Sequence, residues 1–199
     1  MRPASVAGGD LWRVGAPTAA SGDVVAIRPA ADSVSPAVRY ELDMTDRIEI
    51  RSADSGDSDF VAGLASSLLE FGSPAWKDPE AMAPGFRKVL AEAVRHQDQR
   101  AAVLIAEDED GTPLGFISLK VVKDVAGIER GHAADLAVTE SARHSGVGRA
   151  LMQAGEAWAR ERGFTVLSLD VWSTNERALE FYRRLGYGAE SLCLIKALD

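Results

Sequence analysis

The feature that most constrains this chain is one stretch, residues 135–151, in which an apolar run leads through a short loop into a helical pattern. The run ends at Val138, and the pattern predicts a helix over about 146–162 that Gly163 ends. Its apolar positions follow at steps of four, three and four residues: Val147, Leu151, Ala154 and Trp158. The stretch therefore predicts a strand, a glycine turn and a helix in succession, which is typical of α/β folds.

The loop of this stretch has the composition of an anion-binding site. Gly146 and Gly148 let backbone N–H groups turn inward without a Cβ atom in the way. The start of the helix adds partial positive charge and several N–H donors. Arg143 and Arg149 flank the turn and suit phosphate oxygens. We therefore expect this loop to bind a pyrophosphate.

Two common nucleotide-binding loops do not match this stretch. A P-loop needs a Gly-Lys-Ser/Thr sequence, which the chain lacks here. A dinucleotide-binding loop needs a third glycine where this chain has Leu151, and seven residues separate Val138 from Gly146. A purely structural turn stays an alternative on these residues alone.

Residue patterns elsewhere predict one mixed-sheet domain over 45–199. Strands are predicted over about 47–51, 102–106, 114–122, 131–138, 166–171 and 191–197. Helices are predicted from Asp57 or Ser58 to Leu69, from Phe86 to Val94, over 146–162 and up to Leu185. Asp-Gly at 110–111 predicts a hairpin, and Ser173–Glu176 resembles a capping box. Residues 1–44, rich in Ala, Ser, Gly and Pro, are interpreted as a disordered or non-native extension, with Met44 an alternative start.

Composition excludes several classes of protein. The chain has 199 residues and a net charge of −8, which argues against nucleic acid as a partner and favours a cationic substrate. Its longest strongly apolar run, 101–106, falls far short of the ~20 residues that cross a bilayer. With no secretory signal visible, we expect a cytoplasmic protein without membrane contact. A single cysteine, Cys193, and three scattered histidines indicate neither a disulfide framework nor a metal site.

Two motifs resemble those of the GNAT superfamily of N-acetyltransferases. Residues 143–148, Arg-His-Ser-Gly-Val-Gly, resemble the family's Arg/Gln-x-x-Gly-x-Gly/Ala loop after a strand that ends in Val. Residues 175–187 resemble its Asn-x-x-Ala-x-x-Phe-Tyr-x-x-x-Gly-Phe/Tyr motif. The resemblance covers about 47–198. It implies a GNAT-type mixed α/β fold: a mostly antiparallel sheet with two splayed parallel strands in its centre and helices on both faces.

The resemblance also implies acetyl-CoA as co-substrate and direct acetyl transfer to a primary amine in a ternary complex. The donor would lie between the strands that end at Val138 and Val171. The residues implied to bind it are Leu136, Val138, Arg143, His144, Ser145, Gly146, Val147, Gly148, Arg149 and Asn175. The Val138 N–H would face the thioester carbonyl, where such a donor stabilises the developing oxyanion.

Tyr182 matches the family tyrosine that faces the sulfur, which implies a hydrogen bond to the leaving group. His132 is the candidate base: it lies six residues before Val138, so on a regular strand the two side chains share a face. Asp135 is expected on the opposite face, and Glu129 or solvent are alternative proton acceptors.

The sequence predicts fewer residues for the acceptor pocket than for the donor site. Trp172, and less so Trp76, are expected in its pocket, and Cys193 is interpreted as a structural residue. The acceptor amine belongs either to a small molecule or to a protein. The resemblance makes a homodimer possible. A non-catalytic acyl-CoA-binding or regulatory module is the alternative function.

Overall fold

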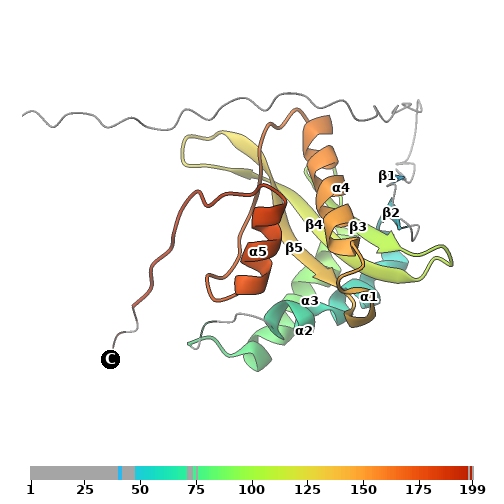
Figure 1. Ribbon diagram of the computed structural model, residues 1–199, viewed down its shortest axis with the longest axis horizontal. Coiled ribbons are helices and arrows are strands. Elements are labelled where there is room, and N and C mark those ends of the chain that lie inside the picture. Colours follow the sequence, from blue (N-terminus) through green and yellow to red (C-terminus); the bar gives the residue numbers. More distant parts are fainter. Residues whose placement is uncertain (1–39, 42–47, 71–73, 75, 197, 199) are drawn as a thin grey trace, which may run out of the picture. The chain divides into compact units, whose positions relative to one another are not determined.

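The computed structural model describes residues 40–41, 48–70, 74, 76–196 and 198. Within them, six strands form one sheet in the order β1-β2-β3-β4-β5-β6. The strands are β1 Tyr40–Glu41, β2 Glu49–Ser52, β3 Ala101–Glu107, β4 Pro113–Lys123, β5 Glu129–Val138 and β6 Leu167–Leu169. Neighbours are antiparallel except β5 and β6, which are parallel. The predicted mixed sheet is therefore confirmed (Figure 1).

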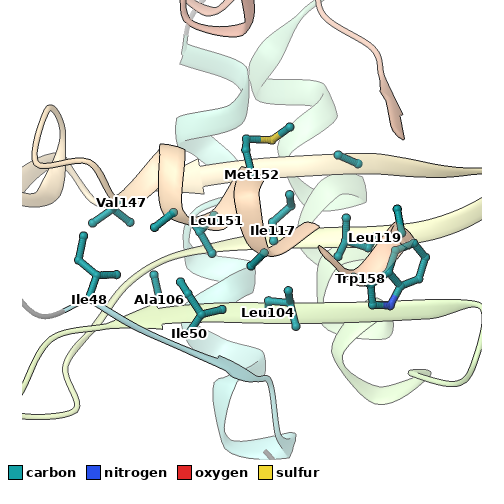
Figure 2. Packing of buried hydrophobic residues seen from close by; sticks show 14 of the residues in the cluster. Ile48, Ile50, Leu104, Ala106, Ile117, Leu119, Val147, Leu151, Met152 and Trp158 are labelled. Carbon is teal, nitrogen blue, oxygen red and sulfur yellow. The ribbon is translucent and has the colours of Figure 1, made fainter. Parts of the chain in front are cut away.

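Helix α4, Val147–Glu161, covers one face of the sheet because its apolar stripe matches the alternation of the strands. In Figure 2, Leu151 of α4 lies beside Ile117 of β4, and Trp158 lies beside Leu119. Gly155 lets the helix approach closely, since a Cβ atom there would lie 3.1 Å from Ile117 Cδ1 and Leu119 Cδ2. A fully buried leucine such as Leu151 contributes roughly 1.5–3 kcal/mol.

Three helices cover the opposite face: α1 Ser58–Gly63, α2 Ala65–Glu70 and α3 Pro79–Arg95. Val61 of α1 and Leu90 of α3 pack there with Ile105 and Phe116 of the sheet. Helix α5, Glu176–Arg184, packs Phe181 and Tyr182 against the buried cluster that α4 forms with the sheet. Helices thus cover both faces, as predicted. None of the helices in the described ranges is long and apolar enough to cross a membrane.

Helix boundaries differ from the prediction where local hydrogen bonds compete with the apolar pattern. The single helix predicted up to Leu69 is broken at Leu64, between α1 and α2. Helix α3 begins at Pro79, seven residues before the predicted start at Phe86, because Asp78 caps it by accepting from Glu80 N at 2.9 Å. The predicted capping box is wrong: Asn175, and not Ser173, is the N-cap of α5, and its Oδ1 accepts from Ala178 N.

The predicted strand 191–197 is not formed over residues 191–196, and Ala197 lies outside the described residues. Leu192 and Leu194 are 72% and 84% exposed, and the segment runs away from the sheet (Figure 1). A strand needs a partner edge, and the adjacent edge strand β6 has only three residues. The parallel pair consequently lies at the edge of the described sheet rather than in its centre, and Cys193 is exposed rather than packed on a strand.

Strand β1 lies within the predicted extension 1–44, and the rest of that extension falls outside the described residues.

Strand β5 contains a bulge that changes which side chains share a face. Ser118 pairs with Asp135, but the next residue of β4, Leu119, pairs with Ala133, so Ala134 is the extra residue. One extra residue reverses the alternation of a strand. His132 consequently shares a face with Asp135 and Ala137, on the side of α1–α3, and not with Leu136 and Val138.

Candidate active site

The site begins where β5 and β6 separate. Their parallel pairing covers only three residue pairs and ends at Ala133 opposite Leu169. Beyond that point the two segments line a cavity of about 700 Å³, bounded by 133–138 on one side and 169–172 on the other. The edge of β5 that faces this opening is therefore available to a ligand that bonds like an added strand.

The loop before α4 adopts the conformation of an anion cradle. His144 has φ of +68° and Gly146 has φ of +92°, so both lie in the left-handed region. Left-handed residues of this kind form backbone concavities that bind anions, and Gly146, as the N-cap, gives the first turn of α4 no side-chain cap. Ser145 Oγ donates to Ala142 O at 2.7 Å and so stabilises the turn. The loop predicted to bind an anion thus lies at the cavity with a fitting backbone.

Four arginines line the same part of the cavity: Arg143, Arg149, Arg177 and Arg184. Arg143 Nη2 donates to Glu70 Oε2 at 3.1 Å, and Arg177 Nη2 lies 3.2 Å from His144 Nε2. Arg184 Nε donates to Glu180 Oε1 at 3.0 Å, and Glu180 also lines the cavity, so Arg143 and Arg184 are both ion-paired. The positive charge of Arg149 and Arg177 near the loop matches a polyanionic ligand. Arg177 and Arg184 lie on α5, and the sequence reasoning did not propose them, although both occur within the second motif.

Most residues predicted to bind the donor line the cavity: Leu136, Val138, Arg143, His144, Gly146, Gly148, Arg149 and Asn175. Gly148 lies against α5, where a Cβ atom would come within 3.4 Å of Phe181 Cζ. Ser145 and Val147 are not among the lining residues. Val147 is fully buried in the core, and the Ser145 hydroxyl serves the turn, so for these two only a backbone role stays a prediction.

Tyr182 projects from α5 and lines the cavity. Its ring makes edge-on contacts with Phe181 at 5.1 Å and Tyr187 at 6.0 Å between centroids. Burial raises the pKa of Tyr182 to about 12, because the charged phenolate would lose its solvation. The hydroxyl therefore keeps its proton at neutral pH and is a hydrogen-bond donor.

His132 is placed differently from the sequence expectation. The bulge at Ala134 puts it on the face opposite Val138, so the argument that the two side chains share a face is wrong. It is not among the lining residues, and its side chain is only 12% exposed. It pairs with Ser168, one residue before the last pair of β5 and β6.

Hydrogen bonds orient the His132 ring. Ser168 Oγ donates to Gly131 O at 3.2 Å, so its lone pair is left to accept from His132 Nδ1–H at 3.0 Å. The other nitrogen, Nε2, then carries the lone pair and lies 3.8 Å from Asp170 Oδ2, a residue that lines the cavity. Burial lowers the pKa of His132 below 6.5 and outweighs the neighbouring carboxylate of Asp170, which raises it.

Asp135 is the functional candidate that the sequence reasoning missed. It lines the cavity, and its Oδ2 accepts from the hydroxyl of the buried Ser118 at 2.7 Å. The expectation that it faces away from Val138 holds, but the bulge brings it to the face of His132. The face of Asp135 thus follows from the regular alternation of 135–138, whereas its sharing of that face with His132 comes from the bulge, which no feature of the sequence signals.

The cavity thus has two sides, which we call the α4–α5 side and the α2–α3 side. The α4–α5 side holds the 143–149 loop, the arginines and Tyr182. The α2–α3 side holds Ser67, Leu68 and Phe86 from α2 and α3, together with Asp135. Trp172 lines the cavity next to Asp170, whereas Trp76 is 56% exposed and does not line it.

Comparison with known proteins gives consistent results. The profile described as "Acetyltransferase (GNAT) family" matches residues 65–187. A mycothiol acetyltransferase of Propionibacterium freudenreichii subsp. shermanii is 41% identical over 91 residues, which are 46% of this chain and 29% of that protein. The aminoglycoside N(6')-acetyltransferase type 1 of Klebsiella aerogenes is 39% identical over 103 residues, which are 49% of this chain and 68% of that protein.

The chain thus spans under a third of the first relative and about two thirds of the second. Among solved structures, a putative acetyl transferase from Pyrococcus furiosus superposes with a TM-score of 0.63 at 22% identity, covering 76% of this chain and 99% of that one. At that identity the likeness establishes the fold.

Proposed function

Because the chain belongs to the GNAT acetyltransferase family, an enzyme family whose donor is acetyl-CoA, we propose that it acetylates a primary amine of a small cationic molecule. The observation that carries the proposal is the separation of charge across the cavity. Four arginines against one carboxylate, Glu180, line the α4–α5 side, whereas the other two lining carboxylates, Asp135 and Asp170, lie where β5 and β6 open. An anionic donor and a cationic acceptor are therefore attracted to different parts of the same cavity.

The α4–α5 side fits coenzyme A. The left-handed His144 and Gly146 provide a cradle for a diphosphate, and Arg149 and Arg177 add charge at the same place. The open edge of β5 from Leu136 to Val138 suits the amides of the pantetheine arm. When bound, acetyl-CoA supplies an acetyl thioester for direct attack by the amine.

Two groups of the chain stabilise the charge that develops in this transfer. The Val138 N–H is proposed to donate to the acetyl oxygen. Tyr182 Oη is proposed to donate to the leaving sulfur. Because a thiol has a pKa of ~8.5, Tyr182 with a pKa of about 12 acts by hydrogen bonding and keeps its proton.

The acceptor is held by charge and by a fixed carboxylate. Asp135 is oriented by Ser118 and offers its remaining lone pairs to the cavity, where they suit a substrate ammonium. The reactive amine has to lose a proton, since an ammonium has no lone pair. Asp170, which lines the cavity and whose Oδ2 lies 3.8 Å from His132 Nε2, is proposed to accept that proton and pass it on to Nε2.

A turnover assay tests the proposal. Purified protein, acetyl-CoA and a panel of amines are combined, and the release of free thiol is followed. The panel holds monoamines, diamines, polyamines, an aminoglycoside and a lysine peptide. We expect turnover with small multiply charged amines and little with the peptide. Turnover with the peptide alone contradicts the small acceptor. Donor binding without turnover across the panel favours the non-catalytic acyl-CoA module.

A further inference from the structure

A lysine of the chain itself lies over an aromatic ring at the cavity. Lys77 Nζ lies 5.4 Å from the ring centroid of Trp172 and 5.0 Å from that of Trp76. Lys77 precedes α3, whereas Trp172 follows β6, so the contact joins segments 95 residues apart in the chain. A cation at this distance is attracted by the negative face of an indole ring.

The two rings differ in their access to the cavity. Trp172 lines it, beside Asp170, whereas neither Trp76 nor Lys77 is among the lining residues, so the contact lies at the edge of the cavity. Among the described residues, no carboxylate forms an ion pair with Lys77. Its ammonium is therefore attracted by the faces of the two indole rings. Exposed contacts of this kind are worth about 0.5–1 kcal/mol, which a competing cation of similar strength can replace.

We infer that the face of Trp172 is a subsite for a second cationic group of the acceptor, held by the Lys77 ammonium when no acceptor is bound. This inference rests on the proposed function and narrows its acceptor to molecules with two or more cationic groups. In this arrangement Asp135 binds the cationic group closer to the acetyl group that is transferred, and the face of Trp172 binds the second, more distant cationic group. The remote cation displaces Lys77 without breaking a covalent bond or an ion pair seen among the described residues.

The experiment compares diamines with monoamines of equal length. Linear α,ω-diamines of three to eight carbons and the matching alkylamines are assayed with the full-length protein, and the ratio of their kcat/KM values is measured. We expect a ratio above one that peaks at one chain length, because the two subsites lie at a fixed spacing. Lys77→Met removes the competing cation and is expected to raise the ratio about fivefold.

Two further variants decide the interpretation. Trp172→Leu removes the ring and is expected to lower the ratio about fivefold. Lys88→Met, which removes an exposed lysine of α3, is the matched control and should leave the ratio unchanged. A ratio that Lys77→Met lowers, or that Trp172→Leu leaves unchanged, overturns the subsite, since Lys77 would then only tie two segments together.

Calorimetry separates this inference from the proposed function. The full-length protein, without donor, is titrated with the diamine of optimal length and with its monoamine. Tighter binding of the diamine, weakened by Trp172→Leu, supports the subsite even if no amine is acetylated. Equal binding of the two amines overturns the subsite even if both amines are acetylated.

Discussion

The α4–α5 side and the α2–α3 side of the cavity are built by different means. On the α4–α5 side, the loop conformation and the buried face of α4 fix the backbone, and Val147 and Leu151 are fully buried. On the α2–α3 side, short helices interrupted at Leu64 carry half-buried side chains such as Leu68 and Phe86. On the proposed function, the comparison teaches that a constant donor is bound by backbone geometry, whereas the acceptor is chosen by replaceable side chains.

If the α4–α5 side carries the chemistry, the largest loss follows from Tyr182→Phe. Removing the hydroxyl that donates to the leaving group is expected to lower kcat about 100-fold, while the KM for acetyl-CoA changes less than about twofold. Steady-state kinetics measures both. Tyr187→Phe is the matched control, because Tyr187 Oη instead donates to Glu156 Oε1 at 3.3 Å. Equal effects of the two substitutions would remove the role of Tyr182.

A substitution of His132 tests whether this residue receives the proton that the acceptor amine loses. His132→Gln is expected to lower kcat/KM about 30-fold and to remove an acid limb from the pH–rate profile. Because burial lowers the pKa of His132, that limb lies below pH 6.5. His96→Gln, at the exposed end of α3, is the control and should keep the limb. A limb that persists in His132→Gln excludes this base.

The same histidine makes a prediction about stability. Its pKa is lowered in the folded protein, so the unfolded chain binds more protons as the pH falls below 6.5. The free energy of unfolding is therefore expected to decrease with falling pH in that range. Denaturant titrations should show a smaller decrease in His132→Gln. An identical decrease in both proteins would contradict the buried, neutral ring.

Gly146→Ala tests the proposal that the backbone of the 143–149 loop binds the donor. A Cβ atom is strained at φ of +92°, by about 1–2 kcal/mol. If the loop relaxes to relieve this strain, the KM for acetyl-CoA rises about tenfold. Gly163→Ala is the matched control, because Gly163 has φ of +78° at the other end of α4. Should both variants alter the KM equally, a general loss of stability and not the cradle is responsible.

The smallest effect is expected on the α2–α3 side, where Asp135→Asn keeps the shape but removes the charge. The KM for the acceptor is expected to rise about fivefold, with no change for acetyl-CoA. Asp110→Asn, in an exposed turn, is the control. A change in the KM for acetyl-CoA alone would show that the two sides are not separate in function.

Sequence reasoning anticipated the local structure of the α4–α5 side for a physical reason. The 143–149 loop and the face of α5 are local features, and their residue spacing reports the backbone that they form. It failed where distant segments decide. The bulge at Ala134 depends on pairing with β4 and reverses the face of His132. The strand predicted over 191–197 rests on a local residue pattern, which does not report whether an edge is there to pair with.

The sequence by itself determined the order of most elements, the glycine loop with its arginines, and Tyr182 on a helix after the second parallel strand. These follow from periodicity and from glycines that only certain turns require. Tertiary structure alone decided that β5 and β6 separate after Ala133, that Asp135 lies at the opening, and that Lys77 meets Trp172. Such contacts join residues far apart in the chain, and no local pattern encodes them.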